Sequence, residues 1–321
     1  MAAMVATQLL LFGLPCSVVL LVRQTEEDPA WHMDWREIVP LRWPGFRNLL
    51  MIALLMLLAE PVMMLLSALS ALVANNNIGE IVDEIAVTQG FWATLLVVAV
   101  MPSIMEELMF RGVILSGYKN KPVWIMVLVN GLFFGIMHTD LQQFLYAVVM
   151  GCLAAYMVHK TRSFFAGVLA HFMVNATSVV MMFVTPETEA VTAAEIDAMV
   201  GFEKELYLWT EANPELAAAI MMGVISLVTI PLFCVLFMVF KRHNEKRNAK
   251  ADAKALAQAA DIDAEGASAI GIIGTADAEI EVVDDSGADK SRPFGAAFWG
   301  VVALYAVIMG LIWVGTNMAA A

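Results

Sequence analysis

The sequence predicts an all-α, polytopic membrane protein, and three observations lead to this class. Of the 321 residues, 60% are hydrophobic and only 15% are charged. Apolar runs recur along the chain, many of them near the roughly 20 residues that a helix needs to cross the hydrocarbon core. Backbone polar groups cannot stay unpaired in lipid, so we expect the spans to be helices. The sequence therefore predicts a multi-pass protein of the cell membrane.

The apolar runs predict about eight transmembrane helices, and the loops between them alternate in charge. Loops that contain several Lys or Arg residues alternate with loops that contain few or none, as the positive-inside rule requires. The alternation predicts that both termini lie outside the cytoplasm. The spans are expected at residues 1–22, 49–74, 88–117, 122–138, 144–159, 164–184, 216–240 and 295–315.

This span pattern divides the chain into five segments. We predict N-terminal spans with a cytoplasmic loop over 1–87, a core of spans three to six over 88–184, an external loop with the seventh span over 185–240, a cytoplasmic loop over 241–294, and the last span within 295–321. The fourth segment is rich in Ala, Asp and Gly, so it is expected to be disordered because it buries too little apolar surface to offset its ordering entropy.

The loop that precedes the seventh span contains apolar residues at helical spacing between Ile196 and Trp209. This periodicity predicts an amphipathic helix that lies on the outer membrane surface. Most of the net charge of −13 comes from acidic residues in this loop and in the later part of the cytoplasmic loop. Neither stretch carries a basic footprint, which argues against a nucleic-acid partner.

The third span contains charged residues that a membrane helix rarely holds. The stretch "MPSIMEELMFRG" contains Glu106, Glu107 and Arg111, and Pro102 is expected to break the helix before it restarts near Met105. Adjacent residues on a helix point about 100° apart, so the two glutamates face different directions. Glu107 and Arg111 can pair at i,i+4, which leaves Glu106 without a local charged partner. Charges placed in this way usually face a functional cavity.

The fourth and sixth spans add polar groups on single faces. Asn130, Phe134 and His138 follow one another at steps of four, as do His171 and Asn175. At about 1.5 Å per residue, Glu106 and His138 come to depths that agree within about one helical turn. The polar groups of three spans can therefore meet at mid-membrane depth. A buried carboxylate, two imidazoles and an amide are suited to activate water and to bind an oxyanion.

The motifs "EELMFRG", "FFGIMH" and "HFMVN", in this order, resemble those of the CPBP family of CAAX-protease and bacteriocin-processing (Abi) intramembrane endopeptidases. The resemblance implies hydrolysis of a peptide or protein substrate, which can itself be membrane-anchored. It further implies Glu106 as the base that activates water and His138 as the residue that orients it. His171 and Asn175 would stabilise the oxyanion, with Glu107 and Arg111 as a supporting ion pair.

Other functions remain compatible with these residues. Glu106, His138 and His171 could instead ligate zinc, because carboxylate and imidazole are ordinary zinc ligands. The metal-free mechanism is favoured, since no HExxH places two histidines on one helical turn. Intramembrane carboxylates and histidines also form proton relays in transporters. A non-catalytic scaffold that gives immunity to a bacteriocin is a further alternative.

Overall fold

The structure is a computed structural model that describes residues 1–25, 34–74, 77–185 and 193–270, and none of these residues forms a strand. The all-α prediction is confirmed. Six helical stretches are long and apolar enough to cross a membrane, and a seventh, α8 (Val123–Met137), is apolar but shorter. The predicted eighth span at 295–315 lies outside the described residues. The six stretches are Ala2–Val22, Phe46–Ala71, Ile81–Gly117, Leu141–Thr161, Phe164–Val184 and Pro214–Gln258.

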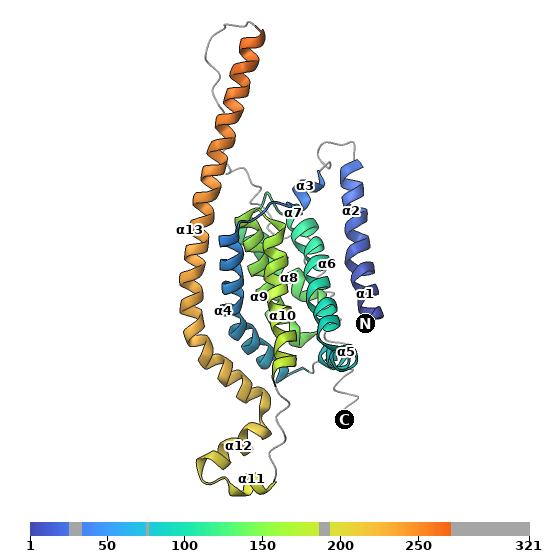
Figure 1. Ribbon diagram of the computed structural model, residues 1–321, viewed down its shortest axis with the longest axis vertical. Helices are drawn as coiled ribbons and strands as arrows, with labels where there is room; N and C mark the ends of the chain where they lie inside the picture. Colours follow the sequence, from blue (N-terminus) through green and yellow to red (C-terminus); the bar gives the residue numbers. More distant parts are fainter. Residues whose placement is uncertain (26–33, 75–76, 186–192, 271–321) are drawn as a thin grey trace.

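The first span is a continuous helical rod at one side of the bundle (Figure 1). It consists of α1 (Ala2–Gln8), the π-helical turn η1 (Leu9–Gly13) and α2 (Leu14–Thr25). The short α3 (Trp35–Ile38) follows, and the Asp34 side chain caps its first turn. The second span, α4 (Phe46–Ala71), is central to the bundle, because α9, α10 and α13 all pack on it.

The third span departs from the predicted break at Pro102. The chain runs through α5 (Asn77–Thr94), η2 (Leu95–Val100), α6 (Met101–Glu107), η3 (Leu108–Ile114) and α7 (Leu115–Gly117). Pro102 falls in the first turn of α6, directly after the π-helical η2, so the helix continues through it. The prediction of a break there is wrong, because a π-helical turn can absorb the missing N–H. The helix instead kinks at Gly90, whose φ of 75° suits glycine.

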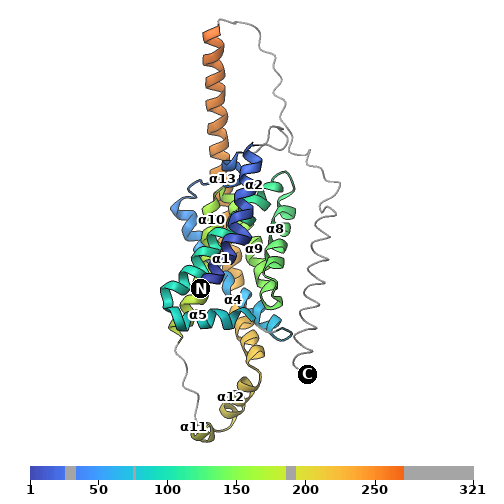
Figure 2. The ribbon, with the colours of Figure 1, turned by 90° about the vertical axis from the view of Figure 1, so that its right-hand side faces the viewer.

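Helices α9 (Leu141–Thr161) and α10 (Phe164–Val184) both pack on α4, whereas α8 packs mainly on α9 and lies beside it in Figure 2. Helices α8 and α9 approach closely at two glycines, since a Cβ on Gly151 would lie 2.8 Å from the Cα of Gly131. Small residues allow this contact between membrane helices. The main apolar core joins these helices with α4 and α13, and it includes Met56, Phe134 and Met157.

The last described helix extends beyond its predicted end. After α11 (Ala193–Ala198) and α12 (Phe202–Ala212), α13 runs without interruption from Pro214 to Ile270. The sequence predicted disorder from residue 241, and the first part of that segment is helical instead. Two features explain the difference: its Ala, Lys, Glu and Arg residues favour helix, and polar contacts fix it. The contacts join Asn244 to Asn48, Arg247 to Pro44 and Asn248 to Lys160.

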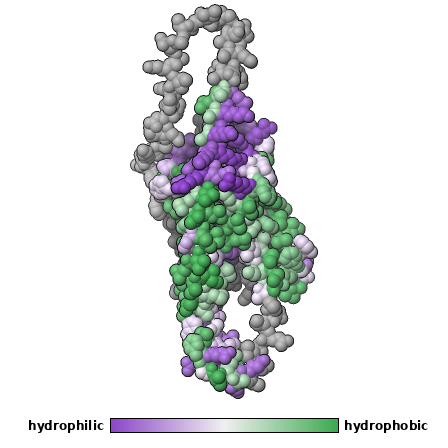
Figure 3. Space-filling view, turned by 60° about the vertical axis from the view of Figure 1, so that its left-hand side comes forward, coloured by the Kyte–Doolittle hydropathy of each residue, from purple (hydrophilic) through white to green (hydrophobic). Residues whose placement is uncertain are grey.

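The surface shows an apolar belt that borders a strongly hydrophilic end, whereas the opposite end mixes polar and apolar residues (Figure 3). Large exposed side chains such as Leu54, Phe165 and Val228 contribute to the apolar surface. Exposed apolar surface of this extent is expected where lipid is the solvent. The basic segments gather at one end of the bundle, where Lys119 contacts Glu37 and Arg162 contacts Asp252. The protein is therefore a multi-pass membrane protein with a basic end.

Candidate active site

The buried centre of the site is an ion pair that also holds a histidine. Arg111 donates to Glu107 Oε1 across 2.5 Å, and the same oxygen lies 3.0 Å from His171 Nδ1. All three side chains are at most 2% exposed. A second Arg111 nitrogen donates to the Gly151 carbonyl at 3.2 Å. The predicted pairing of Glu107 with Arg111 is present, and His171 of the sixth span contacts the same carboxylate.

Helix packing leaves Glu107 little freedom. A Cβ on Gly167 of α10 would lie 2.4 Å from Glu107 Oε2, so a residue without a side chain is required beside the carboxylate. Phe134 of α8 forms the neighbouring wall. Its ring centroid lies 4.6 Å from the Arg111 guanidinium carbon and 5.4 Å from that of the His171 ring. Aromatic and glycine neighbours therefore fix the ion pair from two sides.

Glu106 lies in a different environment. It is 8% exposed, and its Oε1 accepts a 2.8 Å hydrogen bond from Gln8 Nε2 of the first span. Sequence reasoning found no local partner for Glu106 and missed Gln8, whose partner is 98 positions away. The available signal was an amide within an apolar span, since such groups often bond across helices. Glu106 thus has a neutral partner and no paired cation among the described residues.

The remaining predicted residues surround Phe134 and His171. His138 directly follows α8; its Nδ1 lies 2.8 Å from the Phe134 carbonyl, and its ring stacks edge-on with that of Phe134 at 4.7 Å between centroids. Asn175 Nδ2 lies 3.2 Å from His171 Nε2 and 2.9 Å from the Val98 carbonyl. Within the described residues no hydrogen bond joins Glu106 directly to His138, His171 or Asn175. Five of the six predicted residues therefore form one contact network, with Glu106 beside it.

Asn130, on the same face as His138, has a structural contact. Its amide donates to the Phe110 carbonyl across 2.5 Å and bridges α8 to the π-helical η3. This turn follows Glu107 directly and contains Arg111. π-Helical turns are frequent at functional sites because they redirect side chains within a helix.

A cavity of about 520 Å³ adjoins the site through Asn175. It lies among α4, α9, α10 and α13, and its lining is mainly apolar. Glu60 and Tyr146 also line it, and sequence reasoning did not single out either residue. A carboxylate in the middle of an apolar span was the signal that could have found Glu60.

The described residues do not fit a preformed metal centre. No group of three His, Cys, Asp or Glu side chains among them is arranged to hold an ion. Both ring nitrogens of His171 have polar neighbours, Glu107 and Asn175.

The fold and the site define a helical membrane protein with a buried carboxylate–imidazole centre. Residues 88–177 match the family described as type II CAAX prenyl endopeptidase Rce1-like. Over 108 residues the chain is 31% identical to a Bacillus subtilis protein named "Putative membrane peptidase YdiL". That alignment covers 33% of this chain and 43% of the relative. No solved structure matches the chain. The resemblance to the CAAX-protease family is thus confirmed over the predicted core.

Proposed function

We propose that the chain is an intramembrane endopeptidase that hydrolyses a peptide bond near the membrane, with Glu106 as its base. One observation carries this proposal: two adjacent carboxylates of one span have opposite environments. Glu107 is held by Arg111 and His171, whereas Glu106 accepts a hydrogen bond from the neutral amide of Gln8 and forms no ion pair within the described residues. A carboxylate without a paired cation can accept a proton, as a general base must. The similarity of residues 88–177 to a peptidase family supports the same conclusion.

In this mechanism Glu106 removes a proton from a water molecule, whose oxygen attacks the scissile carbonyl carbon. The proton then passes to the amine that leaves. His138 would orient the water through Nε2, because its Nδ1 is placed to donate to the Phe134 carbonyl. General-base catalysis of this kind contributes about 10²–10⁴-fold to a rate.

His171 and Asn175 would together stabilise the oxyanion, with the Asn175 amide as the donor and His171 as the residue that holds this amide through Nε2. The bond from His171 Nδ1 to Glu107 fixes the ring and directs Nε2 toward Asn175. In the resting arrangement the Asn175 amide faces both His171 and the Val98 carbonyl. Oxyanion binding would therefore redirect one amide hydrogen from His171 to the substrate. A single donor of this type is worth about 10²–10³ in kcat.

The substrate class we propose is a peptide or protein segment, either free or anchored in the bilayer. The cavity of about 520 Å³ beside Asn175 supports this assignment, because its mainly apolar lining suits a segment that arrives from lipid. The family description names CAAX prenyl endopeptidases. Cleavage of a prenylated CAAX substrate by this chain is one specific form of the proposal.

The decisive experiment is a cleavage assay with the full chain in proteoliposomes. We expect a library of quenched fluorescent peptides to be cleaved by the wild type, and Glu106→Gln to abolish turnover while the protein remains folded. Gln removes the negative charge and keeps nearly the same side-chain shape. Library binding without cleavage by the wild type would favour a scaffold, and proton-coupled uptake into the vesicles would favour a transporter.

Metal dependence has its own test. If Glu106 activates water without a metal, activity should survive exhaustive treatment with a strong chelator. About one equivalent of zinc in the purified protein, lost together with activity in His138→Ala and His171→Ala, would replace this mechanism with a zinc-dependent one.

The proposed orientation places the basic end in the cytoplasm and the N-terminus outside. Reporter fusions at Lys121 and Arg162 should give cytoplasmic signals, whereas a fusion at Glu203 should give an external signal. A cytoplasmic signal at Glu203 would contradict the predicted span order.

A further inference from the structure

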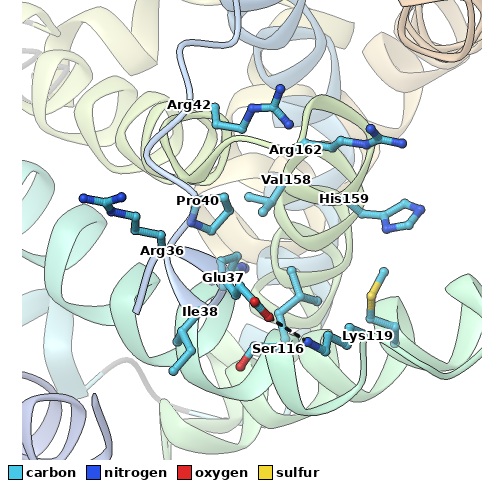
Figure 4. A pocket seen from close by; sticks show the side chains of 13 residues that line it. Arg36, Glu37, Ile38, Pro40, Arg42, Ser116, Lys119, Val158, His159 and Arg162 are labelled. Atoms are coloured by element: carbon cyan, nitrogen blue, oxygen red, sulfur yellow. Dashed lines mark hydrogen bonds and ion pairs between the residues drawn. The ribbon is translucent and has the colours of Figure 1, made fainter. Parts of the chain in front are cut away.

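A second cavity lies at the basic end of the bundle (Figure 4). Its volume is about 380 Å³, and it is lined by the segment that contains α3, by η3 and α7, by the start of α8 and by the end of α9. Five permanently basic side chains and one histidine line it, whereas Glu37 is its one acidic lining residue. The six are Arg36, Arg42, Arg111, Lys119, His159 and Arg162.

Three of the cations have carboxylate partners. Lys119 contacts Glu37 at 3.1 Å, and Arg162 contacts Asp252 through two bonds of 2.6 and 2.8 Å. Arg111 contacts Glu107. These pairs neutralise the charge of three lining residues.

Arg36 and Arg42 are different, because neither guanidinium forms an ion pair within the described part of the chain. Both residues line the cavity and their side chains are exposed: Arg42 extends toward Arg162 (Figure 4), and the Arg36 guanidinium carbon lies 5.5 Å from the centroid of the Trp35 ring. The cavity therefore has an excess of positive charge from two planar guanidinium groups. Guanidinium groups bind phosphate through paired hydrogen bonds, which makes arginine the preferred residue for that ligand.

An unsatisfied donor lies in the wall of the same cavity. Arg111 is 1% exposed and lines the cavity, and its Nε–H has no hydrogen-bond partner among the residues that the structure describes. Buried donors are rarely left unpaired, and an exception requires an explanation. An anion in the cavity would supply the missing acceptor.

We infer that this cavity binds the phosphate of an anionic lipid headgroup. It lies at the basic end of the bundle, next to the Lys119–Glu37 and Arg162–Asp252 ion pairs. Ile38, Val158 and Leu115 add apolar lining for the lipid backbone. Basic pockets between membrane helices on the cytoplasmic side recognise such headgroups. The inference concerns binding alone and does not depend on peptidase activity.

The test compares two pairs of arginines in phosphatidylcholine nanodiscs. Fluorescent phosphatidylglycerol is titrated into the wild type, into Arg36→Gln/Arg42→Gln and into Arg47→Gln/Arg242→Gln. The second pair is the matched control, because it removes two exposed arginines of the same basic end outside the cavity lining. We expect saturable binding with about 30-fold lower affinity in the cavity variant and little change in the control. Equal losses in both variants would overturn the inference in favour of diffuse surface attraction.

A competition experiment identifies the source of the phosphate. Inorganic phosphate should displace the lipid only weakly, since it lacks the apolar part that contacts Ile38 and Val158. Displacement by inorganic phosphate with the same affinity as by phosphatidylglycerol would assign the cavity to a free anion and overturn the lipid assignment.

Crosslinking of the wild type keeps the test independent of variant folding. A photoactivatable phosphatidylglycerol should label the segments around Arg42, Lys119 and His159. Labelling confined to other segments would overturn the inference.

Discussion

Glu106 and Glu107 are neighbours in the chain, yet the two sides of the helix that hold them differ in almost every respect. The Glu107 side is filled by a cation, an imidazole and the backbone of Gly167. The Glu106 side holds one neutral hydrogen bond, from Gln8. A carboxylate that is paired with a cation contributes to the framework, whereas in the proposed mechanism the carboxylate without a paired cation accepts a proton. If the proposed mechanism holds, charge in this span has two separate uses, structural and catalytic, within one turn of helix.

The largest expected effect comes from breaking the partnered side. Glu107→Ala should lower the free energy of unfolding by about 3–5 kcal/mol, because it leaves Arg111 as an uncompensated buried charge. Unfolding in detergent micelles measures the change. Glu106→Ala, measured in parallel, should lower the free energy of unfolding much less, because it leaves no buried charge without its partner. Equal losses of stability in the two variants would show that Glu106 and Glu107 are equally important for the fold, which would contradict the contrast.

A double variant tests whether the loss comes from the stranded charge. Glu107→Leu combined with Arg111→Met replaces both charges by apolar side chains of similar length. Such replacements of buried pairs are often neutral or stabilising. The double variant should therefore recover most of the stability that Glu107→Ala loses, although His171 then lacks its partner and activity should remain low.

The second effect concerns the space beside Glu107. Gly167→Ala should lower stability by about 1–3 kcal/mol, because the new Cβ would lie 2.4 Å from Glu107 Oε2 and 2.9 Å from Val158 Cγ2. Gly223→Ala is the matched control in α13, where a Cβ meets no atom within 4 Å. The control should be unchanged or stabilised by up to about 1 kcal/mol. Thermal unfolding of both variants, compared with the wild type, measures the two changes in stability.

The sequence predicted the parts of this arrangement that depend on local spacing. The i,i+4 relation placed Arg111 on Glu107, and steps of four placed His171 beside Asn175. Helix geometry is enough for such pairs. The apolar runs likewise predicted the described spans, because only helices satisfy the backbone in lipid.

The sequence did not predict contacts that depend on how distant helices pack. Gln8 reaches Glu106 across 98 positions, and His171 reaches Glu107 across 64. The continuous helix through Pro102 depends on a π-helical turn that apolar periodicity does not reveal. The helical start of the segment after residue 240 depends on contacts such as Asn48–Asn244, which composition alone cannot show.

A smaller effect on stability is expected on the Glu106 side of the helix. Gln8→Leu removes the donor to Glu106 and should change stability by about 1 kcal/mol or less, as for an ordinary hydrogen bond. Turnover should fall several-fold, because the carboxylate loses the bond that orients it. Thr7→Ala, one residue earlier, is the control, since its hydroxyl bonds only within its own helix, to Ala3. Unchanged turnover in Gln8→Leu would show that Glu106 is positioned by its own helix.

The smallest effect should come from an ion pair on the surface, which calibrates the buried one. Arg162 and Asp252 form two hydrogen bonds, but their side chains are 42% and 52% exposed. Such pairs contribute little, because water and salt screen them. Asp252→Asn should therefore leave the melting temperature unchanged at physiological ionic strength, as should the control Asp197→Asn, which removes an exposed contact to Lys204. A loss comparable to that of Glu107→Ala would mean that burial does not separate the two kinds of pair.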